Sequence, residues 1–405
     1  MCKEEKPRVD EIEKTRKEIE VLTKKFPDVL GDRKGKIEWC RLEKCAIKTP
    51  KGLKVVKKGQ VVPQALRGMT KEYFKDLETR GVIRKSSSEW RNPVRAIQKP
   101  DGSIRVVSNL MALNSMVEKD PLELVNIREV VRGTEGSRYF TVLDLKEAFY
   151  HIEIEEADKH KTAFEFDGVV YEWTSMVMGF MNSPQILQRV MNTIFGDLRG
   201  KGVEAYMDDI VVHGESKEEH DRLLNETLQR LQRNKMRVNP KKIQYCQKEV
   251  KLLGVTVDGK EQSASEIKKN EAMEYPVPAT VKELRRFLGL TGWFRQFIKD
   301  YARLTENLTE GLKGTDKKRS LVWTDKMQGE FEEMKRQIGN MKNLLLPRYN
   351  REFMLRTDAS NTGLGAVLLQ QDENKEWRPI QWASKKLTAT EKRYGITEKE
   401  MLAIV

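Results

Sequence analysis

Two adjacent aspartates between two short apolar runs are the feature that most constrains how this chain can fold. Residues 205–212 read Ala-Tyr-Met-Asp-Asp-Ile-Val-Val, with Asp208 and Asp209 at the centre. This pattern predicts a strand, a turn and a second strand. Adjacent residues of a strand point to opposite faces, so only a turn lets both carboxylates lie near one site. Taken alone, the pair is more simply explained as a polar turn, because Asp is common there.

Length and charge limit the class of protein. The chain has 405 residues, which predicts two to four domains, and its 75 Lys and Arg against 62 Asp and Glu give a net charge of +13. A basic excess fits a polyanionic partner, although charge bears on association and not on the reaction. No apolar run approaches the roughly 20 residues needed to span a bilayer, so no membrane partner is expected.

The N-terminus and the cysteines indicate where in the cell the protein is expected. The charged start Met1–Lys6 lacks the apolar core of a secretory signal. Four cysteines form no CxxC pair and no zinc-like spacing with the histidines, which favours free thiols in a reducing intracellular setting and argues against structural zinc. They are Cys2, Cys40, Cys45 and Cys246.

Periodicity and turn residues predict the following elements. Apolar residues at helical spacing predict helices over residues 10–25, 70–80, 183–195, 217–234 and 280–301. Thr70 is expected to cap the second of these helices, and Gly81 to follow its end. Strands are expected over 94–99 and 104–107 around an Asp101-Gly102 turn, over 139–145 and 250–257, and as short stretches within 40–64. Pro276 and Pro278 mark a domain boundary, and residues 312–320 a basic linker.

A second acidic residue closes another apolar strand. Phe140-Thr141-Val142-Leu143-Asp144 is apolar enough to be buried and ends in a carboxylate. Two-metal nucleotidyl transfer needs carboxylates from separate strands to hold two cations about 3.5–4 Å apart. A strand ending in Asp144 beside the Asp208-Asp209 hairpin supplies that set. The two segments together are a much stronger signal than either alone.

The chain at this point resembles a known family. The segments that carry the resemblance occur in order as Leu143–Phe149, Lys161–Phe164, Met178–Pro184, Tyr206–Asp209 and Leu253–Gly254. Spaced in this way, they resemble the polymerase motifs of reverse transcriptases, closest to those of gypsy-type LTR retrotransposons. The resemblance extends through Gly81–Ile83, Phe287–Leu290 and Thr357–Ser360, and covers roughly residues 60–405.

The resemblance implies an α+β fold: a right-hand polymerase with fingers, palm and thumb, followed by a connection and a partial RNase H-like α/β domain. The domains it implies are an N-terminal extension over 1–62, fingers and palm over 63–258, thumb and connection over 259–350, and a truncated RNase H-like domain over 351–405.

The resemblance also assigns roles to single residues. Asp144, Asp208 and Asp209 are expected to be the catalytic carboxylates and metal ligands, with the backbone carbonyl of Leu145 also near the metal and Asp208 the more direct ligand of the hairpin pair. Phe149 is expected to crowd the 2′ position of the incoming nucleotide, which favours a dNTP. Further substrate-binding residues are expected to be Arg105, facing the triphosphate, and Gly179 and Pro184, at the helix under the nascent base pair.

Two departures from the family pattern weigh against an intact fingers region. Asn109 and Met111 stand where the family usually has an Asp and an Arg, so fingers geometry or rate is in doubt. Either Lys241 or Lys242 is expected near the pyrophosphate, and the sequence does not choose between them.

A second site is incomplete in the sequence. By resemblance, Asp358 ends the first strand of an RNase H domain, and Glu400 best matches its second metal ligand. The later elements and two further acids are missing. The chain is therefore expected to polymerise but not to cleave RNA in a hybrid, and to be a fragment of a longer polyprotein.

The leading hypothesis is an RNA-directed DNA polymerase of a retrotransposon Pol polyprotein that extends a primer with dNTPs on an RNA or DNA template. It implies two Mg²⁺ ions, with Mn²⁺ as a substitute, and other Pol and Gag segments as partners. It also implies an intracellular, cytoplasmic location, with virus-like particles and the nucleus as further sites. The alternatives are a degenerate or co-opted remnant that binds nucleic acid without catalysis, and a generic basic scaffold, which explains the charge but not the order of the motifs.

Overall fold

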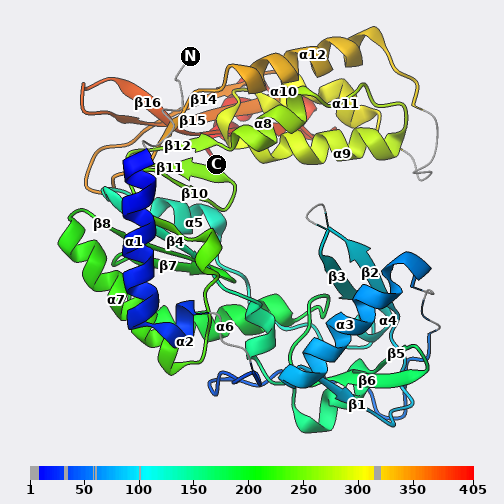
Figure 1. Ribbon diagram of the computed structural model, residues 1–405. Helices are drawn as coiled ribbons and strands as arrows, with labels where there is room; N and C mark the ends of the chain where they lie inside the picture. Colours follow the sequence, from blue (N-terminus) through cyan, green and yellow to red (C-terminus); the bar gives the residue numbers. More distant parts are fainter. Residues whose placement is uncertain (1–8, 32–34, 58, 60–61, 100–101, 314–320) are drawn as a thin grey trace. The chain divides into compact units, whose positions relative to one another are not determined.

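The computed structural model describes residues 9–31, 35–57, 59, 62–99, 102–313 and 321–405 (Figure 1). The chain divides into two compact units. The first contains the residues up to Gly133 together with Tyr139–Gln247, and the second contains Thr134–Arg138 and Lys248–Val405. The four domains expected from the sequence remain a prediction beside this division.

An antiparallel four-stranded sheet forms the centre of the first unit. Its strand order is β7-β8-β4-β9, with bounds Val203–Tyr206, Asp209–Gly214, Tyr139–Asp144 and Gln244–Gln247. Helices α6 (Ser183–Phe195) and α7 (Lys217–Arg233) contact each other and pack on these strands. The apolar face of α7 is buried there, because its leucines recur every three or four residues. Helix α1 (Val9–Lys25) packs on β9.

The rest of the first unit is built from two small sheets and a long helix. The sheets are β1-β6-β5 (Ile83–Lys85, Val169–Trp173, Phe164–Phe166) and the hairpin β2-β3 (Val94–Gln98, Ile104–Ser108). Helix α3 (Gln64–Arg80) contacts β1, β2 and β3, and its buried Phe74 has its ring centroid 5.0 Å from that of Phe164. The short helices are α2 (Pro27–Leu30), α4 (Met111–Asn114), α5 (Ile127–Arg132), η1 (Ala148–His151), η2 (Glu156–Thr162) and η3 (Pro240–Lys242).

The second unit contains two antiparallel sheets and a group of helices. One sheet is β10-β11-β12-β13 (Val250–Leu252, Val255–Val257, Glu261–Ala264, Leu344–Leu345), and the other is β14-β15-β16 (Met354–Ala359, Gly363–Gln371, Trp377–Lys386). The helices are α8 (Glu266–Met273), α9 (Val281–Gly292), η4 (Trp293–Phe297), α10 (Tyr301–Leu304), α11 (Glu306–Glu310), α12 (Asp325–Gly339), η5 (Glu391–Arg393) and α13 (Ile396–Ile404). Helix α9 begins where it does because Thr280 and Glu283 form a reciprocal capping box.

Some expected elements differ from those observed. Thr70 does not cap a helix, because α3 begins six residues earlier at Gln64, and the Thr70 hydroxyl donates to the Leu66 carbonyl inside it at 2.7 Å. Pro63 stands just before the helix, and a proline in this place is itself a signal for a helix start. The end at Gly81 is confirmed, with a left-handed φ of 75°.

The strand expected over 250–257 is instead a hairpin of β10 and β11, turning at Leu253-Gly254. A run of apolar residues does not reveal a turn that lacks the usual polar residues. Of the strands expected within 40–64, the described residues show only isolated bridges, at Cys45 and Val56. Asp101, Val61 and residues 314–320 of the expected linker lie outside the described residues. None of the helices in the described ranges combines the length and apolar character needed to cross a membrane.

Gly259 is a position where the fold of the second unit requires glycine. Its φ is +80°, and a Cβ placed there would lie 1.9 Å from the Ser137 carbonyl oxygen. The Gly259 carbonyl also accepts a hydrogen bond from the Gly136 amide at 2.9 Å. We expect Gly259→Ala to lower the free energy of unfolding by more than about 1 kcal/mol, because it combines a strained φ with a backbone clash.

A matched control is Gly329→Ala, within the exposed face of α12, where a Cβ would meet no atom within 4 Å. This change should raise stability by about 0.5–1 kcal/mol, because Gly weakens a helix interior. Urea unfolding of the two variants measures the difference. Equal effects of the two substitutions would contradict the assignment.

Candidate active site

The register of the central sheet brings the three expected aspartates together. Asp144 is the last residue of β4 and pairs directly with Asp209, the first residue of β8. Tyr206 of β7 pairs with Asp209 as well, which leaves Met207 and Asp208 as a two-residue turn. The Leu145 amide donates to the Asp208 carbonyl at 2.9 Å, so the turn is bonded to the residue after Asp144. All three aspartates are half-buried.

The turn itself is strained. Met207 has a φ of 53°, in the left-handed region that favours glycine. Such a conformation costs a residue with a side chain roughly 1–2 kcal/mol and persists only where its surroundings hold it. The sheet pairing on both sides of the turn supplies part of that restraint.

Gln188 of α6 provides a further restraint on the turn at Met207, and it was not predicted from the sequence. Its side chain is fully buried. The Gln188 Oε1 atom accepts from the Met207 amide at 2.9 Å, while Nε2 donates to the Ala205 carbonyl at 3.2 Å and to Asn192 Oδ1 at 3.0 Å. A polar side chain on the buried, apolar face of a helix is the signal that could have revealed it.

Negative charge is concentrated at this site. Burial raises the pKa of Asp209 from its ordinary 3.8 to about 6, with the charges of Asp208 and Asp144 acting in the same direction. The Lys242 ammonium opposes them: its Nζ lies 3.1 and 3.0 Å from the two Asp144 carboxylate oxygens. Of the two candidate lysines, Lys242 is therefore the one that contacts an aspartate of the site. Clustered carboxylates are donors that Mg²⁺ and Mn²⁺ prefer.

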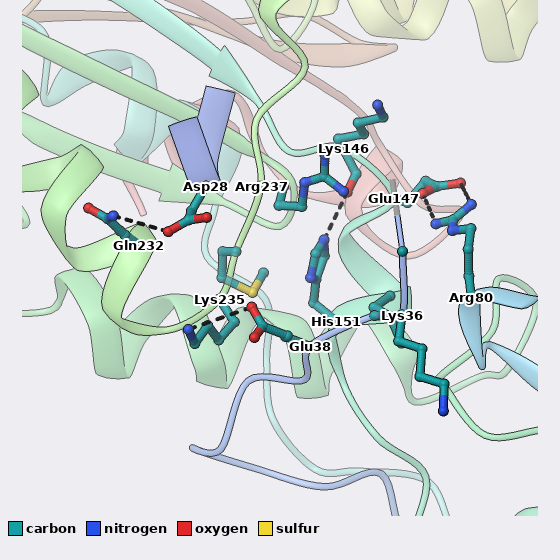
Figure 2. Close-up of a pocket in the computed structure, with 13 residues that line it drawn as sticks. Asp28, Lys36, Glu38, Arg80, Lys146, Glu147, His151, Gln232, Lys235 and Arg237 are labelled. Atoms are coloured by element: carbon teal, nitrogen blue, oxygen red, sulfur yellow. Dashed lines mark hydrogen bonds and ion pairs between the residues drawn. The ribbon is translucent and has the colours of Figure 1, made fainter. Parts of the chain in front are cut away.

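The loop after Asp144 is held by its own contacts, beside a pocket (Figure 2). Glu147 has a left-handed φ of 53°, and Arg80 of α3 forms two hydrogen bonds to its carboxylate. His151 lies 3.2 Å through Nε2 from the Lys146 carbonyl, and burial lowers the pKa of His151 to about 4, so the ring is neutral near pH 7. These contacts fix η1, which carries Phe149. The Phe149 side chain is half-buried and packs against the core.

The remaining expected substrate-binding residues lie on other elements. Gly179 has a φ of +99°, and its carbonyl accepts from Asn114 Nδ2 at 2.8 Å. Pro184 lies in the first turn of α6, the helix that also carries Gln188. Arg105 is exposed on β3, where its guanidinium contacts the Met178 sulfur. β3 belongs to a different sheet from the three aspartates, so strand register does not bring Arg105 to them.

Asn109 and Met111, the two residues that depart from the family pattern, follow the end of β3. Asn109 is exposed, and its Oδ1 accepts from the Met111 amide at 3.2 Å. The Met111 side chain is 76% exposed. Asn109 thus keeps a local hydrogen bond of the kind an Asp would make, whereas Met111 places an apolar side chain in solvent.

The second expected site is on β14 and α13. Asp358 is exposed on β14, opposite Gly365 of β15, and Glu400 is half-buried on α13. Helix α13 packs against both strands, so the elements carrying the two acids are in contact. Glu398 has a structural role, because its carboxylate accepts a hydrogen bond from the Gly395 amide at 2.7 Å and caps the helix.

One other group of possible metal ligands lies away from the aspartates. The ligand atoms of His220, Asp221 and Cys246 lie within 4.8 Å of one another, and among the described residues the three aspartates do not form so tight a group. Both His220 ring nitrogens already have partners, Thr141 Oγ1 at 2.8 Å and Asp221 Oδ1 at 2.9 Å. Lys217 also binds Asp221 at 2.5 Å. Hydrogen bonds therefore account for how His220 and Asp221 are placed in this group.

Two protein families match this chain. A family model described as reverse transcriptase (RNA-dependent DNA polymerase) matches residues 97–257. A second, described as the RNase H-like domain found in reverse transcriptase, matches residues 323–405. The first match contains the three aspartates, and the second contains Asp358 and Glu400.

Curated relatives of this chain are polyproteins of transposons. The chain is 33% identical over 377 residues to the retrovirus-related Pol polyprotein from transposon opus of Drosophila melanogaster, covering 89% of this chain and 37% of that protein. It is 31% identical over 343 residues to the transposon Tf2-3 polyprotein of Schizosaccharomyces pombe, covering 85% of this chain and 25% of that protein. The chain thus spans well under half the length of these relatives.

Solved structures show the same fold. The foamy viral protease-reverse transcriptase in complex with an RNA/DNA hybrid is similar with a TM-score of 0.83 at 21% identity, covering 96% of this chain and 52% of that chain. The same viral protein in complex with double-stranded DNA gives a TM-score of 0.85 at 21% identity, covering 96% of this chain and 81% of that chain. The mixed α and β fold expected from the sequence is confirmed. The expected kinship is confirmed too: this chain is homologous to the Pol polyproteins of LTR retrotransposons and carries a reverse transcriptase domain followed by an RNase H-like domain.

Proposed function

We propose that this chain acts as an RNA-directed DNA polymerase, extending a primer on an RNA or DNA template by two-metal nucleotidyl transfer as part of a retrotransposon Pol polyprotein. The observation that carries the proposal is the convergence of Asp144, Asp208 and Asp209 at adjoining strand ends of the central sheet. The nucleic acids bound in the foamy viral structures support duplex substrates for this chain as well.

The donor chemistry of the three aspartates fits the metals. Bound Mg²⁺ or Mn²⁺ would lower the pKa of the attacking primer hydroxyl and offset charge on the leaving pyrophosphate. Asp144, Asp208, Asp209 and the Leu145 carbonyl would hold the two ions. Lys242, bonded to Asp144, lies where it can neutralise charge, and we assign it rather than Lys241 to the pyrophosphate side. Asp358 and Glu400 would be ligands of a separate, RNase H-type site.

Nucleotide selection is proposed for other residues. Phe149 would exclude a ribose 2′ hydroxyl, because its half-buried ring is fixed by packing against the core. Arg105 would bind the triphosphate, since its exposed guanidinium is free to leave the Met178 sulfur for a stronger anionic acceptor. Gly179 and Pro184 would support the nascent base pair at the start of α6. The expected setting is the cytoplasm, with virus-like particles and the nucleus as further sites and other Gag and Pol segments as partners.

A degenerate or co-opted remnant that binds nucleic acid without catalysis is the second candidate. The exposed Met111 and uncharged Asn109 favour it, because the family usually has charged residues at both positions.

Primer extension separates the two functions. With an RNA template, an annealed DNA primer, dNTPs and Mg²⁺, we expect the wild type to extend and Asp208→Asn to lose roughly two orders of magnitude or more in rate, because a metal-binding charge is removed. The matched control is Asp167→Asn, an exposed aspartate at a φ of 54°, a conformation that Asn tolerates. A wild type that binds the hybrid but extends under neither Mg²⁺ nor Mn²⁺ would support the remnant.

Metal-free stability should depend on pH through Asp209. Its pKa is raised in the folded state to about 6 from an ordinary 3.8, so the folded protein holds this proton more tightly than the unfolded chain. The resulting stability is fully present below about pH 4 and is lost as pH rises through about 6. After allowance for partial exposure, the change is on the order of 1 kcal/mol.

We therefore expect Asp209→Asn to raise the Tm at pH 8 without divalent cations by roughly 2–4 °C and to have a smaller effect at pH 4. Thermal unfolding of both proteins at each pH measures the difference. Mg²⁺ should stabilise the wild type more than the variant. An identical pH dependence of the two proteins would rule out this account of Asp209.

Gln188 is proposed as a positioning residue that acts through the turn at Met207. In Gln188→Leu, the Met207 amide and Ala205 carbonyl lose their side-chain partner, so the turn that carries Asp208 is less well held. We expect kcat for extension to fall roughly 10- to 100-fold, with little change in KM for dNTP, because misplaced catalytic groups reduce rate more than binding.

The control is Thr193→Val, on the exposed face of the same helix, where the hydroxyl only bonds the Arg189 carbonyl. Partial recovery of kcat by Gln188→Glu, which keeps an acceptor for Met207, would separate positioning from a general loss of stability. A proportional fall in the amount of folded protein with unchanged kcat would show that Gln188 is only structural.

A further inference from the structure

The turn between β10 and β11 has an unusual backbone. Leu252 pairs with Val255, so the turn consists of Leu253 and Gly254 alone. Both are left-handed, with φ of 50° and 88°. Two-residue hairpins of this kind favour Asn-Gly or Asp-Gly, because a bulky residue is disfavoured at positive φ. A half-buried Leu253 in that position indicates that the surroundings hold the turn.

Lys268 of α8 packs directly against this turn. A Cβ added to Gly254 would lie 2.8 Å from Lys268 Nζ and 3.3 Å from the Trp293 ring. The Lys268 ammonium is also 4.1 Å from the centroid of the Trp293 ring, a cation–π contact. The Gly254 carbonyl accepts from the Ser265 amide at 3.3 Å, which joins the start of α8 to the turn. Three separate elements thus position one ammonium group.

The charge of Lys268 is not neutralised by an acid. Among the residues that the structure describes, no carboxylate forms an ion pair with it, whereas the next residue, Lys269, is paired with Glu266 at 2.6 Å. Partial burial lowers the pKa of Lys268, and only the more distant charge of Glu271 acts against this effect. Lys268 is half-buried. A partly desolvated cation without an ion-pair partner gains from any anion that can approach it.

We propose that Lys268, held between the Gly254 turn and the Trp293 ring, binds a backbone phosphate of the nucleic-acid duplex on which the polymerase acts. The identity of the ligand rests on the proposed function. The absence of a side chain at Gly254 leaves room for the Lys268 ammonium beside the turn, because a Cβ there would displace it. A Lys ammonium is a compact point charge suited to a single phosphate oxygen. Residues 268 and 293 lie between the two segments matched by family models, so neither match assigns them.

The test is the salt dependence of binding. Kd for a fluorescently labelled RNA/DNA hybrid is measured between 50 and 200 mM salt, without dNTPs or divalent cations, for the full chain and for Lys268→Met, which keeps an apolar stem over Trp293. Losing one phosphate contact should weaken binding about equally for all sequences and reduce the slope of log K against log salt by about 1.

Lys269→Met is the matched control, because its charge is already paired with Glu266. We expect its slope to stay close to that of the wild type. Gly254→Ala should weaken binding in the same direction as Lys268→Met by displacing the ammonium, and thermal unfolding confirms that each variant is folded before binding is compared.

An unchanged slope in folded Lys268→Met, or an equal fall in Lys269→Met, would overturn the proposal. A second result would also overturn it: inorganic phosphate stabilises the wild type but not Lys268→Met, while both bind the hybrid equally well. That result would identify a site for a free anion. Primer extension is scored separately. A wild type that binds the hybrid with the Lys268-dependent slope but does not extend refutes the proposed function and leaves this inference standing.

Discussion

The pairing of β4 with β8 is the interaction on which the rest of the site depends. It places Asp144 directly opposite Asp209, although like charges in direct cross-strand positions repel. The strands tolerate this repulsion because their interiors are buried: Leu143, Ile210 and Val211 are nearly inaccessible to solvent. Each such side chain contributes roughly 1.5–3 kcal/mol when buried. Apolar burial along the strands therefore holds together acids that would otherwise separate, and the raised pKa of Asp209 is the electrostatic consequence.

A second feature recurs in three loops of the chain. Met207, Glu147 and Leu253 all have left-handed φ values that cost a residue with a side chain some energy. In each case a side chain from a helix contacts the loop: Gln188 of α6, Arg80 of α3 and Lys268 of α8. The first two loops flank the three aspartates. The recurrence supports a common physical role, in which strain in a loop is maintained by a neighbouring helix so that the loop presents one conformation.

Much of the fold could be predicted from local patterns. Helices α6 and α7 and strand β4 follow from apolar periodicity, and the hairpin at Asp208 follows from a polar pair between apolar runs. The failures were local as well. The start of α3 was misplaced because Thr70, a residue type common at helix starts, lies inside the helix and bonds back to Leu66. The turn at Leu253-Gly254 could not be predicted from propensity, because Leu253 has a left-handed φ that its side chain disfavours.

The sequence by itself determined which carboxylates we propose as metal ligands, because their order and strand context single out Asp144, Asp208 and Asp209 without coordinates. Only the tertiary structure decided how they are held: that Asp144 faces Asp209, that Lys242 and not Lys241 reaches Asp144, and that Gln188 binds the turn. The same is true of the role proposed for Lys268, which depends on its contacts with Gly254 and Trp293. The physical reason is that residue type fixes which chemistry is available, while register and packing between distant segments fix which groups can meet.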